Sequence, residues 1–133
     1  MPAVAKQAAP VPKVLYINLA IYHMIWIDLT DETQLDSLNE LSKHKAQLIF
    51  KHSTRCAISS MAKNRLERGA ANDKVDFYYL DLVKHRQLSN KIAEKFGVYH
   101  ESPQVLLIKN GECIYDESHS GIRIEDITEQ TLT

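Results

Sequence analysis

The segment FKHSTRCAISS, residues 50–60, joins an apolar run to a stretch with helical periodicity and places a cysteine at the junction. The run AQLIFKHS (46–53) is typical of a β-strand, and CAISSMAKNRLERG (56–69) predicts a helix that stops at its glycine. The apolar stripe expected on this helix consists of Ile58, Met61, Ala62 and Leu66. Cys56 is therefore expected at the entrance of a helix that follows a buried strand.

The same alternation of strand and helix occurs on both sides of this junction. MIWIDL (24–29) and VDFYYLDL (75–82) are β-like runs. TDETQLDSLNELSKHK (30–45) and RQLSNKIAEKFG (86–97) have apolar residues at helical spacing, the first behind a Thr/Asp start. Strands separated by helices favour parallel neighbours joined by right-handed crossovers.

The C-terminal part of the sequence has a different pattern. SPQVLLIKNGECIYDES (102–118) is two apolar runs joined by Asn110-Gly111, a strong hairpin signal, and RIEDITEQTL (123–132) predicts a short helix. The hairpin adds two antiparallel strands to the parallel ones. We predict one α/β domain with a mixed central sheet of four to five strands, flanked by helices on both faces.

Composition excludes several classes of function. The chain has 133 residues, 44% of them hydrophobic, and 16 Lys and Arg against 17 Asp and Glu, so no strong field attracts nucleic acid or an anionic membrane. Its two cysteines, Cys56 and Cys113, form neither a disulfide framework nor a structural zinc spacing, so we expect no metal site. A reducing compartment, the cytoplasm, fits this cysteine usage best.

An apolar run near the N-terminus resembles an export signal only in part. VLYINLAIYHMIWI (14–27) contains Asn18 and His23, lacks a small-residue cleavage site before Asp28, and is shorter than the roughly 20 residues of a membrane span. We therefore expect residues 1–23 to be an N-terminal extension, disordered or dispensable, and residues 24–133 to be the domain. A fragment 24–133 that fails to fold would contradict this division.

The expected position of Cys56 favours reactivity. A thiol at a helix start faces unpaired backbone N–H groups and the positive end of the helix dipole, and both favour thiolate over thiol. His52 and Arg55 add polar groups nearby, and Ser59, three residues on, is one helical turn away. The alternative is that Cys56 is a small, inert core residue, because free cysteines are often buried.

The other polar residues of the segment also have structural interpretations. Ser53 and Thr54 are common helix caps or turn residues. His52 is either a packed, hydrogen-bonded residue or a base that serves the thiol.

Three parts of the sequence carry a family resemblance: IFKHSTRCAIS (49–59), Ser102-Pro103, and VLLIKNGECIYDESHSGI (105–122). Over residues 24–133 the chain resembles thioredoxin-fold proteins and, more closely, the YtxJ-type bacillithiol-system proteins, also called monothiol bacilliredoxins. The resemblance implies that Cys56 attacks mixed disulfides between proteins and bacillithiol. It implies S-thiolated proteins as partners, bacillithiol or a similar low-molecular-weight thiol as co-substrate, no tightly bound cofactor, and a monomer or weak dimer.

The resemblance also implies a cis Ser102–Pro103 bond that places backbone beside the sulfur. Two departures from related motifs matter. The family motif has proline after the cysteine, where this chain has Ala57, and ordinary thioredoxins have a second cysteine where it has Ser59. We therefore expect single-thiol chemistry, with the thiol's properties or its choice of partners altered by Ala57.

Two residues of the hairpin are assigned by strand geometry. A strand from Pro103 to Asn110 spans about 23 Å, so Cys113 lies too far from Cys56 for a disulfide and is expected to be a small strand residue. The returning strand brings His119 back toward Cys56. His119 is then either a contact for the thiol ligand or part of an ordinary surface turn.

Two other classes of function remain open. The domain could be a non-catalytic thioredoxin-fold module that binds a partner or senses oxidation at Cys56. A glutaredoxin-like iron–sulfur carrier would need a dimer and an external thiol to complete four thiolates.

Overall fold

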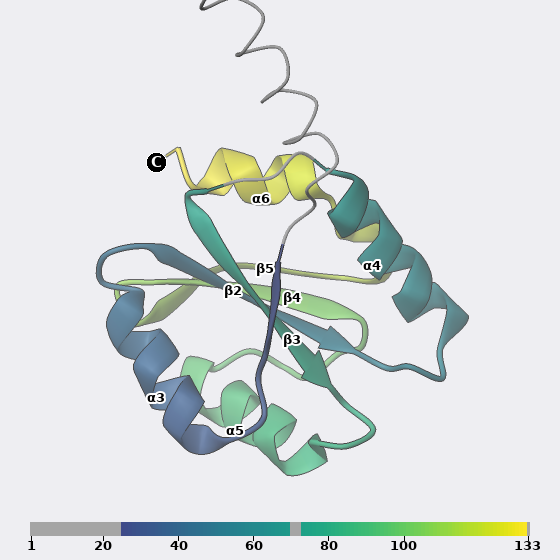
Figure 1. The fold of residues 1–133 in the computed structure, drawn as a ribbon, viewed down its shortest axis with the longest axis horizontal. Helices are drawn as coiled ribbons and strands as arrows, with labels where there is room; N and C mark the ends of the chain where they lie inside the picture. Colours follow the sequence, from purple (N-terminus) through teal and green to yellow (C-terminus); the bar gives the residue numbers. More distant parts are fainter. Residues whose placement is uncertain (1–24, 70–72, 133) are drawn as a thin grey trace, which may run out of the picture.

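A five-stranded mixed sheet organises the chain (Figure 1). The computed structural model describes residues 25–69 and 73–132, so the proposed extension 1–23 lies outside the described residues. The strands are β1 (Trp26–Asp28), β2 (Ala46–His52), β3 (Val75–Asp81), β4 (Gln104–Lys109) and β5 (Glu112–Ser118), in the order β1-β3-β2-β4-β5. The first three run parallel, and β4 and β5 are antiparallel to their neighbours, as predicted.

Helices cover both faces of this sheet (Figure 1). They are α3 (Glu32–Leu41), α4 (Ala57–Arg68), α5 (Arg86–Phe96) and α6 (Ile124–Gln130), with a 3₁₀ turn, η1 (His119–Gly121), before α6. The Asp31 carboxylate caps α3 by accepting a hydrogen bond from the Gln34 N–H at 2.9 Å. Gly97 ends α5 with a φ of 66°, a left-handed conformation that glycine adopts without strain.

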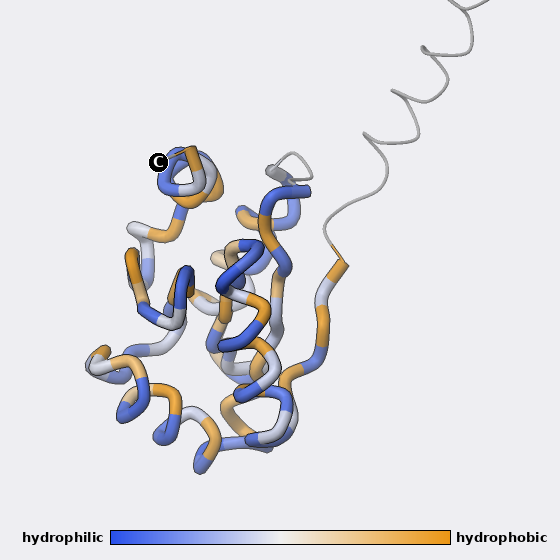
Figure 2. The backbone as a smooth tube through the Cα atoms, turned by 90° about the vertical axis from the view of Figure 1, so that its left-hand side faces the viewer, coloured by the Kyte–Doolittle hydropathy of each residue, from blue (hydrophilic) through white to orange (hydrophobic). Residues whose placement is uncertain are grey.

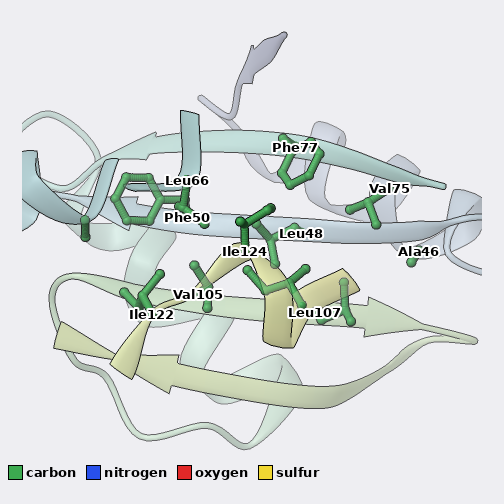
Figure 3. Packing of buried hydrophobic residues seen from close by; sticks show 12 residues of the cluster. Ala46, Leu48, Phe50, Leu66, Val75, Phe77, Val105, Leu107, Ile122 and Ile124 are labelled. Atoms are coloured by element: carbon green, nitrogen blue, oxygen red, sulfur yellow. The ribbon is translucent and has the colours of Figure 1, made fainter. Parts of the chain in front are cut away.

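Each face of the sheet has its own hydrophobic core, because successive strand residues point to opposite faces. Leu48 and Phe50 of β2 pack toward α4 and α6, with Leu66, Ile124 and Val105 (Figure 3). Ile49, which lies between them in β2, points to the opposite face, toward α3 and α5. The core on that face consists of Leu29, Leu35, Leu38, Ile49, Tyr78, Leu80, Leu88, Ile92, Leu106 and Ile108. Figure 2 shows the corresponding mixture of hydrophobic and hydrophilic positions along the backbone.

The predicted apolar stripe of α4 is wrong at two positions. Ile58 and Met61 are 54% and 60% exposed, whereas Ala62 and Leu66 are buried. The third buried residue of α4 is Ser59. The helix turns this serine inward because its hydroxyl has polar partners at the end of β2, and the apolar side chains next to Cys56 are left at the surface.

The β4–β5 hairpin has the predicted turn. Asn110 and Gly111 both have positive φ, 53° and 78°, which is the conformation of a type I′ turn. Ser42, at the end of α3, holds this turn from below: its carbonyl accepts the Asn110 N–H at 2.8 Å, and its hydroxyl accepts the Gly111 N–H at 2.9 Å. The Ser42 hydroxyl itself donates to the Asn39 carbonyl.

An irregularity in β5 was not predicted. Leu107 pairs with Tyr115 but Ile108 pairs with Cys113, so Ile114 is an extra residue in the strand. This bulge turns Tyr115 toward the α4/α6 core and Cys113 toward the α3/α5 core, although residues two apart normally share a face.

Candidate thiol site

Cys56 is the residue at which α4 begins. Its backbone is extended (φ −111°, ψ 121°), its N–H donates to the Ser53 carbonyl at 3.1 Å, and its own carbonyl accepts the Ser60 N–H at 3.1 Å. The side chain is partly exposed. Cys56 is therefore a partly exposed N-cap residue, and its side chain makes no capping hydrogen bond to the backbone of α4.

Ser59 links α4 to the end of β2. Its hydroxyl oxygen is fully buried, accepts the Ser53 N–H at 3.0 Å, and lies 2.6 Å from His52 Nδ1. These two bonds hold Ser59 to the strand end and so fix the turn that carries Cys56. The serine at the position of a second cysteine thus serves as a connection within the site.

His52 is packed in the protein interior beneath the turn that carries Cys56. It is 4% exposed, and its ring lies 5.5 Å from that of Phe50 and 5.3 Å from that of Tyr79. Burial, followed by the nearby Lys63 charge, lowers the pKa of His52 below its usual 6.5, so the ring is neutral at neutral pH.

The Ser102–Pro103 bond is cis, as the resemblance implied. Lys51 pairs with Gln104 in the β2–β4 ladder, so Pro103 comes next to the end of β2, from which the Cys56 turn departs. We call this edge of the sheet, formed by the end of β2, the start of β4 and the end of β5, the thiol edge. The Ser102 hydroxyl is buried there without a hydrogen-bond partner among the described residues.

His119 lies at the thiol edge, where the sequence placed it. Its N–H donates to the Pro103 carbonyl at 3.0 Å, and its Nδ1 lies 3.4 Å from a Glu101 carboxylate oxygen. Arg65 of α4 donates to the His119 carbonyl at 2.9 Å and to the Ile122 carbonyl at 3.1 Å. These contacts connect α4 to the end of β5, and no pattern around Arg65 predicted them.

The remaining predicted residues of the site are Thr54 and Arg55. Both are exposed in the turn between β2 and α4. They can meet a partner that approaches Cys56, whereas His52 and Ser59 act from beneath the surface.

Cys113 is remote from this site. It pairs with Ile108 close to the hairpin turn, at the other end of β4 from Pro103. Its thiol donates to the Tyr115 carbonyl at 3.3 Å, and burial raises its pKa to about 11. Cys113 is thus a strand residue whose thiol stays protonated at neutral pH.

A buried polar group near the thiol edge was missed in the sequence. Lys51 is fully buried, and its Nζ lies 3.3 Å from the Ser89 carbonyl and 3.3 Å from His100 Nδ1. A lysine inside the apolar run AQLIFKHS was the available signal, but the sequence does not show whether such a side chain points inward or reaches solvent.

Two kinds of feature are absent from residues 25–69 and 73–132. No cluster of His, Cys, Asp and Glu there could hold a metal ion. No helix in these ranges has the length and apolar character needed to span a membrane.

Comparison with known proteins identifies a family and a fold that match this chain. The family model described as monothiol bacilliredoxin BrxC matches residues 27–127. A solved structure named provisionally as an oxidoreductase with a thioredoxin fold is 30% identical, with a TM-score of 0.71 over 82% of this chain and 95% of that one.

Two thioredoxins share the fold at lower identity. That of Malassezia sympodialis is 18% identical, with a TM-score of 0.63 over 84% of this chain and 90% of its own. That of Schistosoma mansoni is 24% identical, with a TM-score of 0.59 over 80% of this chain and 97% of its own. The predicted thioredoxin-like architecture is therefore confirmed.

Proposed function

Because the chain belongs to the monothiol bacilliredoxin family, whose model matches residues 27–127, we propose that it removes bacillithiol from mixed disulfides on proteins through Cys56. The thioredoxin fold and the family together make it a redox protein. The proposal adds the substrate, a protein thiol capped by a low-molecular-weight thiol, and the residue that reacts. We place this reaction in a reducing compartment such as the cytoplasm.

The observation that carries the proposal is the isolation of one accessible thiol. Cys56 is partly exposed at the start of α4, while the position three residues on is a buried serine and Cys113 is at the far end of the sheet. A second protein thiol is thus not positioned to displace a partner from Cys56. Single-thiol exchange is the chemistry that this arrangement supports.

The proposed step is a thiol–disulfide exchange. The Cys56 thiolate attacks the bacillithiol sulfur of the mixed disulfide, forms a Cys56–bacillithiol disulfide, and expels the target protein's thiolate, which then takes up a proton. A second low-molecular-weight thiol, acting as reductant, then attacks the bacillithiol sulfur of the adduct, forms a low-molecular-weight disulfide with it, and releases the Cys56 thiolate. The supporting groups are His52, Ser53 and Ser59 beneath the thiol, and Thr54, Arg55, Ser102, Pro103 and His119 around it.

A transfer assay tests the proposal. A model protein whose single cysteine carries bacillithiol is mixed with the reduced chain, and both products are followed by intact mass. We expect the model protein to lose bacillithiol while Cys56 gains it. Cys56→Ser should abolish the transfer, and Cys113→Ser is the matched control that should preserve it.

The same assay with glutathione in place of bacillithiol tests the choice of thiol. Equal rates with the two thiols would contradict a bacillithiol preference. Failure to form an adduct with either would contradict the oxidoreductase proposal.

One observation favours a second candidate, a module that binds a partner. Ile58 and Met61 are exposed on the first turns of α4, next to Cys56. If Cys56 accepts the adduct but never removes it from the model protein, a binding or sensing role of this surface replaces the enzymatic one.

A further inference from the structure

Lys51 is an unusual residue for its position. It lies in β2 between the core residue Phe50 and the buried His52, and its side chain is fully buried among the α3/α5 side of the sheet. Burial lowers its pKa from 10.5 to about 8, so it still carries a proton at neutral pH. Within the described part of the chain it forms no ion pair with a carboxylate.

The Lys51 amine donates to two groups on different segments. One is the Ser89 carbonyl in α5, and the other is His100 Nδ1, just before the cis-proline; both distances are 3.3 Å. Burial, then the positive charges of Lys51 and Arg86, lowers the pKa of His100, so its ring is neutral and can accept from the amine. Lys51 therefore ties β2 to α5 and to the segment that leads into Pro103.

The segment Tyr99–Pro103 is held at several points. Gln104 is buried, donates to the Tyr99 carbonyl at 2.8 Å and accepts the Glu101 N–H at 3.4 Å. The Ser89 hydroxyl lies 3.2 Å from His100 Nδ1. Lys51 of β2 pairs with Gln104 of β4 in the antiparallel ladder. One anchor of the segment, Lys51, therefore lies on β2, the strand whose end carries the Cys56 turn.

A buried amine without a carboxylate partner costs stability, and an apolar side chain of similar length would fill this place at lower cost. The contacts of Lys51 thus point to a geometric role. We propose that Lys51, acting through His100, is a positioning residue that holds Tyr99–Pro103 in place to bind the polypeptide exchanging with Cys56. This inference rests on the proposed function, because it assumes that the partner is a polypeptide disulfide.

Two probes separate this role from the reactivity of the thiol. The first is 5,5′-dithiobis(2-nitrobenzoate), a small aromatic disulfide that needs no contact with the segment. The second is a short synthetic peptide whose single cysteine carries one thionitrobenzoate. In both cases the Cys56 thiolate displaces thionitrobenzoate, which is coloured, and forms a new disulfide with the remaining sulfur. The ratio of the two rate constants measures what the peptide contacts add.

We expect Lys51→Met to lower the peptide-to-small-probe ratio about tenfold, the scale of a small misplacement of binding groups, while the small-probe rate is unchanged. Its thermal midpoint should equal or exceed that of the unchanged protein, because the substitution removes a buried charge. Both acceptors keep a partner: the Ser89 carbonyl lies within α5, and His100 Nδ1 retains the Ser89 hydroxyl. If the role of Lys51 were merely structural, its replacement would lower the thermal midpoint of the protein instead.

Substitutions of His100 provide a second, independent arm. His100→Leu removes the acceptor and should lower the peptide-to-small-probe ratio as Lys51→Met does. His100→Gln keeps an acceptor, so its ratio should lie within about twofold of that of the unchanged protein. Lys45→Met, which removes a partly exposed lysine at the opposite end of β2, is the matched control and should leave the ratio unchanged.

An unchanged ratio in both Lys51→Met and His100→Leu would overturn the proposal. So would a small-probe rate that falls in parallel with the peptide rate, or a failure of His100→Gln to restore the ratio. Neither probe contains bacillithiol, so a protein that shows the expected ratios but fails the transfer assay contradicts the proposed substrate and leaves the role of Lys51 supported.

Discussion

Replacing Ser59 by alanine tests the connection between α4 and β2 that supports the thiol. The change removes the bond to the Ser53 N–H and the bond to His52 Nδ1, at 3.0 and 2.6 Å. Each loss leaves a polar group without its partner in a buried or partly buried place, which costs about 1–3 kcal/mol. The better helix propensity of alanine returns about 0.5 kcal/mol. The two losses less this gain should lower the free energy of unfolding by about 1.5–5.5 kcal/mol.

Urea unfolding followed by circular dichroism measures this difference, and a thermal scan should show a midpoint about 10 °C lower. Ser60→Ala is the matched control: the neighbouring serine is exposed, so its replacement should change stability by less than about 0.5 kcal/mol. If Ser59→Ala matches Ser60→Ala in both measurements, the two hydrogen bonds do not stabilise the site and the reasoning is refuted.

Three further predictions follow from the pKa values and the backbone. Burial lowers the pKa values of His52 and His100, so below about pH 6.5 the unfolded chain takes up protons that the folded chain does not. The urea concentration at the unfolding midpoint should therefore decrease as the pH is lowered below about 6.5, and an increase would contradict this. With a pKa of about 11, only about one Cys113 side chain in a thousand is a thiolate at pH 8. Brief treatment with iodoacetamide should therefore alkylate Cys56 alone, as measured by peptide mapping. Equal alkylation of the two cysteines would refute the assignment of Cys113 as an unreactive strand residue. Gly111→Ala should destabilise by about 1–2 kcal/mol in urea unfolding, because φ is 78° while an added Cβ would meet only the Asn39 amide at an ordinary contact distance of 3.7 Å; no loss would contradict the strain argument.

Much of the fold could be predicted because its signals are local. The strand-then-helix alternation and the Asn110-Gly111 turn each depend on a few adjacent residues, and the structure has these elements as predicted. The position of Cys56 follows from them, since a residue between a strand and a helix must lie at the helix start. The placement of His119 combined the resemblance, which implies that Pro103 lies beside Cys56, with the lengths of the two hairpin strands.

What could not be predicted depends on side-chain contacts that hydrophobic periodicity does not encode. Ile58 and Met61 follow the helical period of Leu66, but Ser59 takes the inward position because His52 and Ser53 lie beneath it. Such hydrogen bonds override hydrophobic periodicity and leave no local pattern.

The burial of Lys51 is another nonlocal feature, since its acceptors are 38 and 49 residues away in the chain. The bulge at Ile114 likewise exists only in the pairing of two strands. In each case the deciding contact is made by the fold and is not written in the neighbouring residues.

The clamp of Ser42 on the β4–β5 turn affects how this protein can be labelled. Hairpin tips usually tolerate inserted tags and dyes, because their backbone amides face water. Here the amides of Asn110 and Gly111 are both bound by Ser42, so an insertion at this tip would break the bonds between the turn and the end of α3. The exposed turn at Thr54 and Arg55 is no substitute, because it carries the thiol. A reporter group is better attached to an exposed helix side chain such as Glu94 of α5.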